Sequence, residues 1–234
     1  MSLPALVRVP RAWGDGGDPM CEAAGMDVGL PEAATVAAST LGEQTAAVAA
    51  ALPELPVVLG GCCCAHIGAT SGLAGRHGRI AVIWFDAHGD LNTPETSPSG
   101  NAWGMPFRMI LDEGHAAVPD CALIGARNLD PPERDFIDQA GLETSDRNLA
   151  QVVAGTAGAY IAFDCDVLDP PEVDCFMPEP DGPSLDACVA MVGAVASHAR
   201  VLGIGFTGLV PSDANPARLR RLLTAALPAQ AEGS

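Results

Sequence analysis

Basic residues are scarce in this chain, and their scarcity excludes one large class of partner. The 234 residues include 12 Lys and Arg against 29 Asp and Glu, which gives a formal net charge of −17 at pH 7. A surface of this sign repels phosphate backbones, so no nucleic-acid partner is expected. Bound cations would neutralise part of the acidity.

Long apolar runs are also missing, although hydrophobic residues make up 48% of the chain. No run reaches the roughly 18 to 20 apolar residues that a membrane span needs, so no membrane partner is expected. The sequence opens without the basic segment, apolar stretch and cleavage site of an export signal. These two absences predict a cytoplasmic protein.

No serine-rich or glycine-rich linker and no internal repeat divides the chain. Its length fits one domain, so we predict a single α/β domain over residues 1–227 and a disordered tail at 228–234. Eight cysteines are present, three of them consecutive at 62–64. Because no export signal accompanies them, we expect reduced, buried thiols rather than disulfides.

Short apolar runs alternate with longer Ala- and Leu-rich segments along the chain. The apolar runs predict buried strands, and the segments between them carry the apolar spacing of helices. Strand-then-helix repetition predicts a mostly parallel sheet with helices on both faces, in which ligands gather at the carboxyl ends of the strands. We expect strands within 3–10, 55–61, 80–86, 121–126, 159–164 and 200–206, and helices within 32–52, 134–141, 184–199 and 217–227.

Acidic residues and a histidine follow two of these predicted strands. Asp86, His88 and Asp90 alternate directly after IAVIWF, and the period of two of a strand would aim all three side chains to one side. Asp164 and Asp166 follow the run AYIAF in the same manner. Five such ligands from two strand ends could hold two divalent cations.

Four sequence blocks resemble those of a known enzyme family. They are Gly60–Gly61, DAHGDLNTPETSPSGN at 86–101, IGARNLDPPE at 124–133 and DCDVLDP at 164–170. The blocks are similar to the signatures of the ureohydrolases, the superfamily of arginase and agmatinase. The resemblance implies a three-layer α/β/α sandwich and a two-manganese site that hydrolyses a C–N bond of a guanidino or related group.

The resemblance also implies a role for each acidic residue. Asp86 and Asp164 would bridge two metal ions, His88 and Asp166 would complete one ion, and Asp90 would complete the other. Bridged cations lower the pKa of a shared water and make hydroxide available for attack, which is general chemistry of two-metal sites. Asp90 is also the expected catalytic residue, because it would accept a hydrogen bond from that hydroxide.

The remaining ligand of the family is a histidine, and Cys63 stands at its position. A thiolate can ligate a divalent metal but is softer than imidazole, so Zn²⁺ or Fe²⁺ becomes possible beside the expected Mn²⁺. His66 is an alternative, since it lies one helical turn further along. A site with neither ligand is the third possibility.

Polar residues in the same blocks match positions that surround the amino-acid end of the substrate in arginases. They offer donors for a carboxylate and an acceptor for an ammonium group. Stabilisation of the loop by bonds from side chain to backbone is the alternative interpretation. These residues are Asn92, Ser97, Ser99, Asn101 and Asp130.

Two positions depart from the pattern of the family. Trp103 replaces the histidine that shuttles a proton to the leaving amine, and indole cannot transfer protons near neutral pH. Gly208 replaces the glutamate that pairs with the guanidinium group, and a buried cation without a carboxylate partner is costly. Glu179 or Asp181 could compensate from a nearby loop. Classical arginase or agmatinase activity is therefore not expected.

The sequence thus predicts a hydrolase that holds two divalent metal ions. It would cleave a linear C–N bond of an amino-acid-like small molecule by attack of a metal-bridging hydroxide. The head group would be of guanidino, hydroxyguanidino, ureido, formimino or amide type. The alternative is a degenerate, non-catalytic protein of the same fold that retains metal binding and acts as a binding or subunit partner. A homo-oligomer is possible under either hypothesis.

Overall fold

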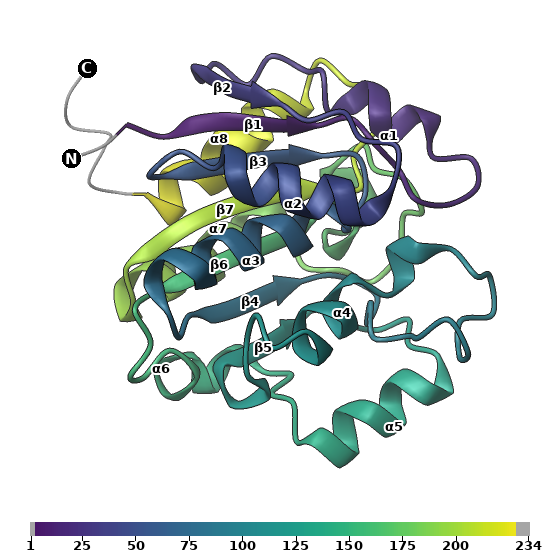
Figure 1. Ribbon diagram of the computed structural model, residues 1–234, viewed down its shortest axis with the longest axis vertical. Coiled ribbons are helices and arrows are strands. Elements are labelled where there is room, and N and C mark those ends of the chain that lie inside the picture. The colour runs from purple at the N-terminus through teal and green to yellow at the C-terminus, as the bar shows by residue number, and fades with distance from the viewer. Residues whose placement is uncertain (1–2, 228–234) are drawn as a thin grey trace.

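A single parallel sheet organises the chain in the computed structural model, which describes residues 3–227 (Figure 1). Its seven strands lie in the order β2-β1-β3-β7-β6-β4-β5, and each neighbouring pair is parallel. This confirms the predicted α/β fold. The strands are β1 Ala5–Val9, β2 Glu32–Thr35, β3 Pro56–Gly60, β4 Ala81–Phe85, β5 Cys121–Ile124, β6 Ala159–Asp164 and β7 Val201–Thr207.

Helices cover both faces of the sheet, so the architecture has three layers (Figure 1). Helices α2, α3 and α4 pack on one face, whereas α6, α7 and α8 pack on the other. The helices are α1 Asp18–Ala23, α2 Leu41–Ala51, α3 Ala65–His77, α4 Pro106–Asp112, α5 Pro131–Ala140, α6 Leu149–Val152, α7 Leu185–His198 and α8 Asn215–Ala226.

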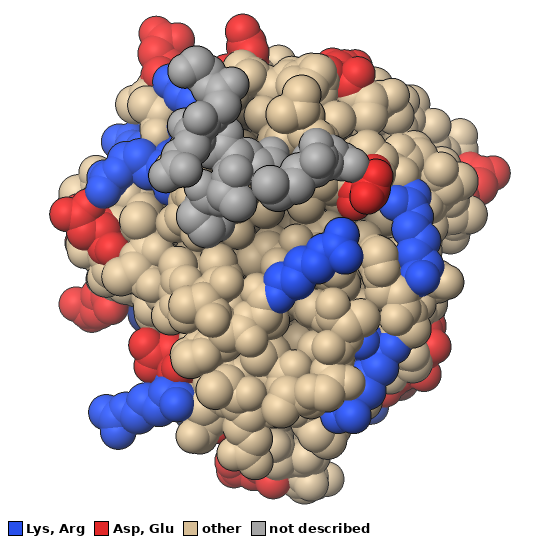
Figure 2. Space-filling view, turned by 90° about the vertical axis from the view of Figure 1, so that its left-hand side faces the viewer, with Lys and Arg blue, Asp and Glu red and all other residues tan. Residues whose placement is uncertain are grey.

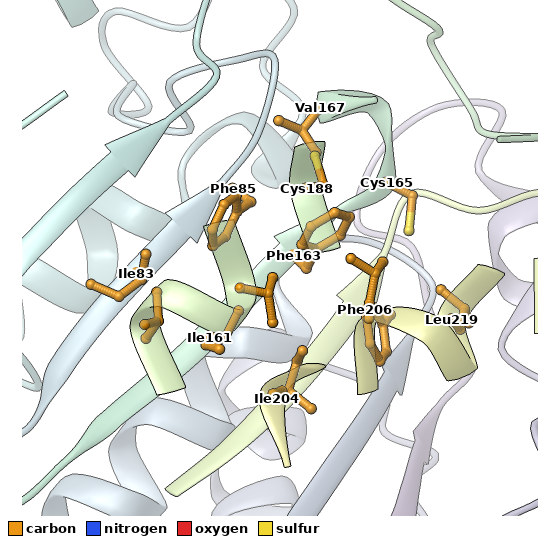
Figure 3. Packing of buried hydrophobic residues seen from close by; sticks show 14 of the residues in the cluster. Ile83, Phe85, Ile161, Phe163, Cys165, Val167, Cys188, Ile204, Phe206 and Leu219 are labelled. Atoms are coloured by element: carbon orange, nitrogen blue, oxygen red, sulfur yellow. The ribbon is translucent and has the colours of Figure 1, made fainter. Parts of the chain in front are cut away.

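The sheet separates two hydrophobic cores. In β4, Ile83 and Phe85 belong to the core beneath α7 and α8, and Val82 and Trp84 belong to the core beneath α2 and α3. Successive side chains of a strand point to opposite faces, so a fully apolar strand serves both cores. Figure 3 shows the first core, in which Phe85 and Phe163 stack with ring centroids 5.3 Å apart.

The predicted helix at 32–52 is wrong in its first half. Residues Glu32–Thr35 form the edge strand β2, and the helix begins only at Leu41. A capping box explains this start, because the hydroxyl of Thr40 accepts from the Glu43 N–H while the Glu43 carboxylate accepts from the Thr40 N–H.

Helix α3 was not foreseen, because its sequence contains glycines at three positions. Two of them let α2 approach: a Cβ at Gly68 would lie 2.7 Å from the Thr45 carbonyl oxygen, and one at Gly72 would lie 2.9 Å from the Ala49 backbone. Glycine here serves close packing between helices, at a cost of about 1 kcal/mol per residue in helix propensity.

Charged side chains of both signs are spread over the face at which the strands begin, with uncharged residues between them (Figure 2). Within residues 3–227, no helix has the length and apolar character needed to cross a bilayer. The predicted disordered tail at 228–234 lies outside the described residues.

The opposite edge, where the strands end, brings the chemistry-bearing loops together. Strands β3, β7, β6 and β4 are consecutive neighbours in the sheet. The segments that follow them therefore lie side by side, although they are far apart in the sequence. These segments carry Cys63, Gly208, Asp166 and Asp86.

Candidate metal centre and substrate cavity

A cavity of about 270 Å³ lies at the carboxyl ends of these strands. All six predicted metal ligands line it, and so do three of the five predicted substrate-binding residues, Asn92, Ser99 and Asp130. Ser97 and Asn101 are not among the lining residues. The six ligands are Cys63, Asp86, His88, Asp90, Asp164 and Asp166.

The ligand atoms form two groups that share Asp86. In one group, atoms of Cys63, Asp86 and Asp90 lie within 4.8 Å of one another. In the other, atoms of Asp86, His88 and Asp166 do so. One shared carboxylate between two clusters is the arrangement that two neighbouring cations require.

Backbone and indole donors fix the two carboxylates expected to bridge. The Trp84 indole N–H donates to Asp86 Oδ2 at 2.9 Å, and the His88 backbone N–H donates to Asp86 Oδ1 at 2.7 Å. The Asp166 backbone N–H donates to Asp164 Oδ1 at 3.1 Å. Each carboxylate is therefore oriented before any cation binds.

The acidic residues are crowded and buried. Burial, followed by the charge of Asp86, raises the pKa of Asp164 to about 6 and that of Asp90 well above its usual range. Burial and the charge of Asp164 likewise raise the pKa of Asp166. Clustered carboxylates repel one another unless protons or cations neutralise them.

Asp90 adds two signs of a cation position. Its Oδ2 is buried and has no hydrogen-bond partner among the described residues. Its backbone φ of 53° lies in the left-handed region, which is uncommon outside glycine and is concentrated at functional sites. The orphaned oxygen, the crowded carboxylates and the two ligand groups together fit a pair of divalent cations.

The geometry favours Cys63 over His66 as the remaining ligand. The Cys63 thiol donates to Asp164 Oδ2 at 2.6 Å, so its sulfur lies inside the cluster. Both ring nitrogens of His66 are engaged elsewhere, with the Tyr160 hydroxyl at 2.8 Å and the Thr207 hydroxyl at 3.2 Å. His66 is fully buried and packs edge-on against Trp84, with ring centroids 5.1 Å apart.

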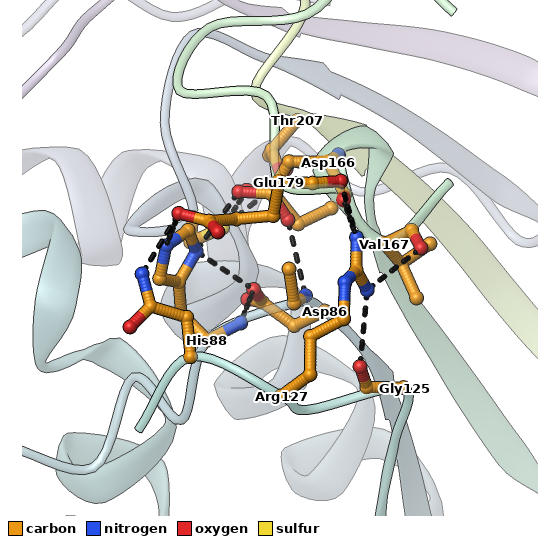
Figure 4. Close-up of polar contacts among 12 residues, drawn as sticks. Asp86, His88, Gly125, Arg127, Asp166, Val167, Glu179 and Thr207 are labelled. Atoms are coloured by element: carbon orange, nitrogen blue, oxygen red, sulfur yellow. Dashed lines mark hydrogen bonds and ion pairs between the residues drawn. The ribbon is translucent and has the colours of Figure 1, made fainter. Parts of the chain in front are cut away.

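His88 sits among three carboxylates (Figure 4). Its Nδ1 lies 2.9 Å from Asp166 Oδ2 and 3.5 Å from Asp86 Oδ1, and its Nε2 lies 3.5 Å from Glu179 Oε1. Burial opposes its charge, yet the hydrogen bonds to Asp166 and Asp86 outweigh burial and raise the pKa of His88 to about 12. A cation between Nδ1 and these carboxylates would replace the proton that holds them together.

Arg127 was not selected from the sequence, yet it ties three loops of the site together (Figure 4). Its guanidinium donates to five backbone carbonyls, those of Gly125, Asp166, Val167, Glu179 and Pro180. Since those loops carry Asp166 and Glu179, Arg127 places both carboxylates against His88. Its only sequence signal was its position inside the block IGARNLDPPE.

A second network holds the polar wall. Glu133 accepts from the Leu91 N–H at 3.0 Å and from the Asp130 N–H at 2.9 Å. Asp130 in turn accepts from the Asn92 side-chain amide at 2.9 Å. Glu133 thus supports two predicted substrate-binding residues, a function that the sequence did not reveal.

The serines and the other asparagine of this loop make local bonds. The Ser97 hydroxyl accepts from the Gly100 N–H, and the Ser99 hydroxyl accepts from the Asn101 N–H. Asn101 Oδ1 accepts from the Asp15 N–H. Loop stabilisation is therefore visible for all three side chains, and Ser99 alone of them also faces the cavity.

The opposite wall is apolar. Trp103 and Phe176 meet edge to face with ring centroids 5.8 Å apart, and Met20 and Met177 line the cavity beside them. Gly208 closes this wall with a φ of 71°, and a Cβ there would stand 2.1 Å from Asp164 Oδ1. A side chain at 208 is therefore incompatible with the present position of Asp164.

Comparisons with known proteins agree on one family. The model of the arginase family matches residues 14–230. The arginase of Bacillus caldovelox is 36% identical over 143 residues, which covers 50% of this chain and 48% of that protein. The chain thus spans about half the length of the curated relatives that it matches in sequence.

Solved structures share the fold over a longer range. The arginase from Bacillus caldovelox superposes with a TM-score of 0.83 over 97% of this chain and 98% of that one, at 22% identity. Formimidoylglutamase from Bacillus subtilis gives a TM-score of 0.78 over 96% and 86% of the two chains, also at 22% identity. At such identities the likeness establishes the fold.

Proposed function

Because the chain belongs to the arginase family, we propose that it is a metal-dependent hydrolase which cleaves a linear C–N bond of a small, amino-acid-like molecule. One observation carries the proposal: all six ligands predicted from the sequence line one cavity, and five of them form two groups that share Asp86. The buried carboxylates would repel one another without bound cations, which supports metal binding. The degenerate alternative also retains metal binding, so a substrate panel separates it from the hydrolase.

The residues divide the work of the reaction between them. Cys63, Asp86, Asp90 and Asp164 would hold one divalent ion, and His88 and Asp166 would complete the second with the shared carboxylates. The two ions, expected to be Mn²⁺ with Zn²⁺ or Fe²⁺ as alternatives, would supply an activated water for attack on the carbon of the C–N bond.

Asp90 is the proposed proton acceptor at that water. Its Oδ2 is buried and has no hydrogen-bond partner among the described residues, and Asp90 lines the cavity. A carboxylate oxygen left free in this position could accept a hydrogen bond from the activated water and take up its proton. Trp103 cannot assist, because an indole N–H does not exchange protons usefully at this pH.

The substrate would lie with its amino-acid end on the polar wall. Asn92, Ser99 and Asp130 offer an amide, a hydroxyl and a carboxylate there. Ser97 and Asn101 would act indirectly, by shaping the loop that carries Ser99. Contacts with both the carboxylate and the ammonium group of the substrate would orient the substrate as well as increase its affinity.

The head group would lie between the ligand cluster and the apolar wall of Trp103 and Phe176. Gly208 offers no carboxylate to a cationic guanidinium, and Glu179 makes an ion-pair contact with His88 instead of reaching the cavity lining. A neutral or weakly basic head group fits this wall better. We therefore favour hydroxyguanidino, ureido, formimino or amide compounds over arginine and agmatine.

Elemental analysis and a substrate panel test the proposal. Purified protein reconstituted with Mn²⁺, Zn²⁺ or Fe²⁺ should hold close to two ions per chain. It should release ammonia, urea or a substituted urea from at least one amino acid with such a head group. Absence of bound ions after reconstitution, or an inactive protein with two ions across the whole panel, would overturn it. The cytoplasmic location and a homo-oligomer stay predictions from the sequence.

A further inference from the structure

The two cation positions of this centre are chemically unlike, and the proposed function rests on both. We propose that the position beside Cys63 selects a thiophilic ion such as Zn²⁺, Fe²⁺ or Co²⁺, while the position beside His88 accepts Mn²⁺, so that the loaded protein carries a mixed-metal centre. Cys63 would bind through its sulfur, with release of the thiol proton to solvent.

The sulfur of Cys63 lies among the carboxylates of the cluster. Cys63 lies at the first turn beyond β3, lines the cavity and is 3% exposed. Its Sγ stands 2.6 Å from Asp164 Oδ2 and within 4.8 Å of ligand atoms of Asp86 and Asp90. Cys63 also belongs to the hydrophobic core beneath α3, so the case for ligation rests on these contacts with the carboxylates.

A buried chain of donors ends at this sulfur. The Tyr160 hydroxyl lies 2.8 Å from His66 Nδ1, and His66 Nε2 lies 3.2 Å from the Thr207 hydroxyl. The Thr207 hydroxyl lies 3.1 Å from Cys63 Sγ and 3.3 Å from Asp164 Oδ2. Residues Tyr160, His66 and Thr207 will be called the donor chain.

One tautomer of His66 lets the donor chain end in a donor. With its single ring proton on Nε2, His66 accepts from the Tyr160 O–H and donates to the Thr207 hydroxyl. The Thr207 O–H is then free to donate to the Cys63 sulfur or to Asp164 Oδ2. In this tautomer the donor chain delivers one hydrogen bond to the anionic side of the centre and adds no charge.

Among the described residues, the ligand group of Asp86, His88 and Asp166 includes no sulfur. His88 and Asp166 present an imidazole nitrogen and carboxylate oxygens, supported by Glu179 and by the backbone N–H of Ala87. Oxygen and imidazole ligands suit Mn²⁺, whereas thiolate selects softer ions. Two ions of different softness are thus matched to the two ligand groups.

Cobalt is the probe, because thiolate ligation of Co²⁺ produces a charge-transfer absorption in the near ultraviolet that oxygen and nitrogen ligands lack. When metal-free protein is titrated with Co²⁺, the intensity of this band should grow as either the first or the second equivalent binds. Added Zn²⁺ should displace the Co²⁺ and remove the band, whereas Mn²⁺ at the same concentration should leave it unchanged. Elemental analysis after loading with one equivalent of Zn²⁺ and then with excess Mn²⁺ should give one of each, because the thiolate position takes the limiting Zn²⁺ first.

Neighbouring thiols provide the matched control. Cys63→Ser should abolish the band and keep one ion per chain, whereas Cys62→Ser, which removes a cavity-lining thiol from the adjacent position, should keep the band. A band that persists in Cys63→Ser, or that disappears in Cys62→Ser alone, would overturn the assignment. Circular dichroism of both metal-free variants establishes that they fold.

The donor chain has its own test. Thr207→Val removes the hydroxyl and should weaken Co²⁺ at the thiolate position by roughly 10- to 100-fold, as loss of an outer-shell partner does. Mn²⁺ binding should weaken less, because among the described contacts Thr207 meets the sulfur and the shared Asp164 carboxylate but no other ligand of that ion. Thr207→Ser should restore the affinity. Equal weakening of both ions would instead indicate a general loss of packing and would remove the donor chain from the proposal.

Failure of this inference can be told apart from failure of the proposed function. Two bound ions with no thiolate band would remove Cys63 as a ligand and leave the hydrolase proposal standing. No bound ion of any kind would overturn both.

Discussion

The ligand cluster and the apolar wall of the cavity differ in how firmly they are built. Asp86 and Asp164 each accept backbone N–H groups within their own loops, so their positions follow from the strand ends. Trp103 lies in the short 3-10 helix Ala102–Gly104 and Phe176 in a loop, and their side chains meet edge to face without a polar anchor of their own among the described contacts. The cluster determines the class of chemistry, and the wall determines which molecules undergo it.

Among the substitutions considered, removal of the shared Asp86 carboxylate should cause the largest loss of cation affinity and of turnover. Asp86→Asn takes a negative charge from both ligand groups, so affinity for both cations should fall by more than the roughly 10- to 100-fold that an outer-shell change costs, and turnover should fall with it. Isothermal titration with Mn²⁺ measures this. Asp135→Asn makes the same change of charge on the exposed face of α5 and should bind both ions normally. Unaltered binding in Asp86→Asn would mean that the two groups do not share a ligand.

The pH dependence of the free energy of unfolding should report on the ligand cluster and not on the apolar wall. In metal-free protein the pKa of Asp164 stands at about 6, above its ordinary 3.8. A raised pKa contributes stability that is fully present below the ordinary value and is lost as the pH rises through about 6. Metal ions replace these protons, so the gain in Tm on loading should widen from pH 5 to pH 8.

Calorimetry with and without Mn²⁺ gives the size of this gap. At a hundredfold excess over Kd each ion contributes about 2.7 kcal/mol, so two ions contribute about 5.4 kcal/mol, or roughly 11 to 22 °C in a chain of this length. A gap that is constant across this pH range would show that protons and cations do not compete for the same oxygens.

Gly208 lies where the apolar wall meets the ligand cluster, so a substitution there should affect both the stability of the fold and cation binding. Gly208→Ala forces a side chain into a left-handed φ of 71° and against Asp164. The free energy of unfolding should fall by on the order of 1 to 3 kcal/mol, and cation affinity should fall too. Chemical denaturation and metal titration measure both.

Gly193→Ala in α7 is the control for that substitution, since a Cβ there meets open space and should be neutral or slightly stabilising. If Gly208→Ala left the free energy of unfolding and cation affinity as unchanged as Gly193→Ala does, the structure of the wall would not affect the ligand cluster. The same clash with Asp164 argues against restoring a guanidinium partner through Gly208→Glu.

The smallest effect is expected from the wall itself. Trp103→Ala removes the ring that faces Phe176 and should raise KM by about tenfold, equivalent to ~1.4 kcal/mol, with cation binding unchanged. Trp103→Phe keeps an aromatic ring and should change KM by much less. Steady-state kinetics on the best substrate of the panel measures this, and a fall in kcat at constant KM would assign Trp103 to the chemical step instead.

Features that follow from local sequence could be predicted better than features that depend on distant parts of the chain. The cluster was predictable, because Asp86, His88 and Asp90 alternate after one apolar run and Asp164 and Asp166 follow another. Alternation and strand ends are local features, and the parallel sheet then brings them together. The sheet itself was predictable for the same reason, since six of its strands are short apolar runs.

Features that depend on distant backbone groups could not be predicted. The acceptors of Arg127 lie in loops up to 53 residues away, and no pattern around residue 127 shows which carbonyls it meets. Helix α3 escaped notice because its glycines are explained only by the approach of α2. At the edge strand β2 the alanines at 33 and 34 favour a helix in the sequence, whereas parallel pairing with β1 makes the segment a strand.

Arg127 also bears on the order of events when the chain folds. Its carbonyl acceptors are brought together only after β5, β6 and the loop at 179–180 have docked, so we expect its hydrogen bonds to form after the main barrier of folding. Bonds made this late slow the escape from the native state more than they speed its formation. Arg127→Met should therefore raise the unfolding rate in stopped-flow experiments and leave the refolding rate nearly unchanged. A single guanidinium would thus slow the unfolding of the site whose loops it joins.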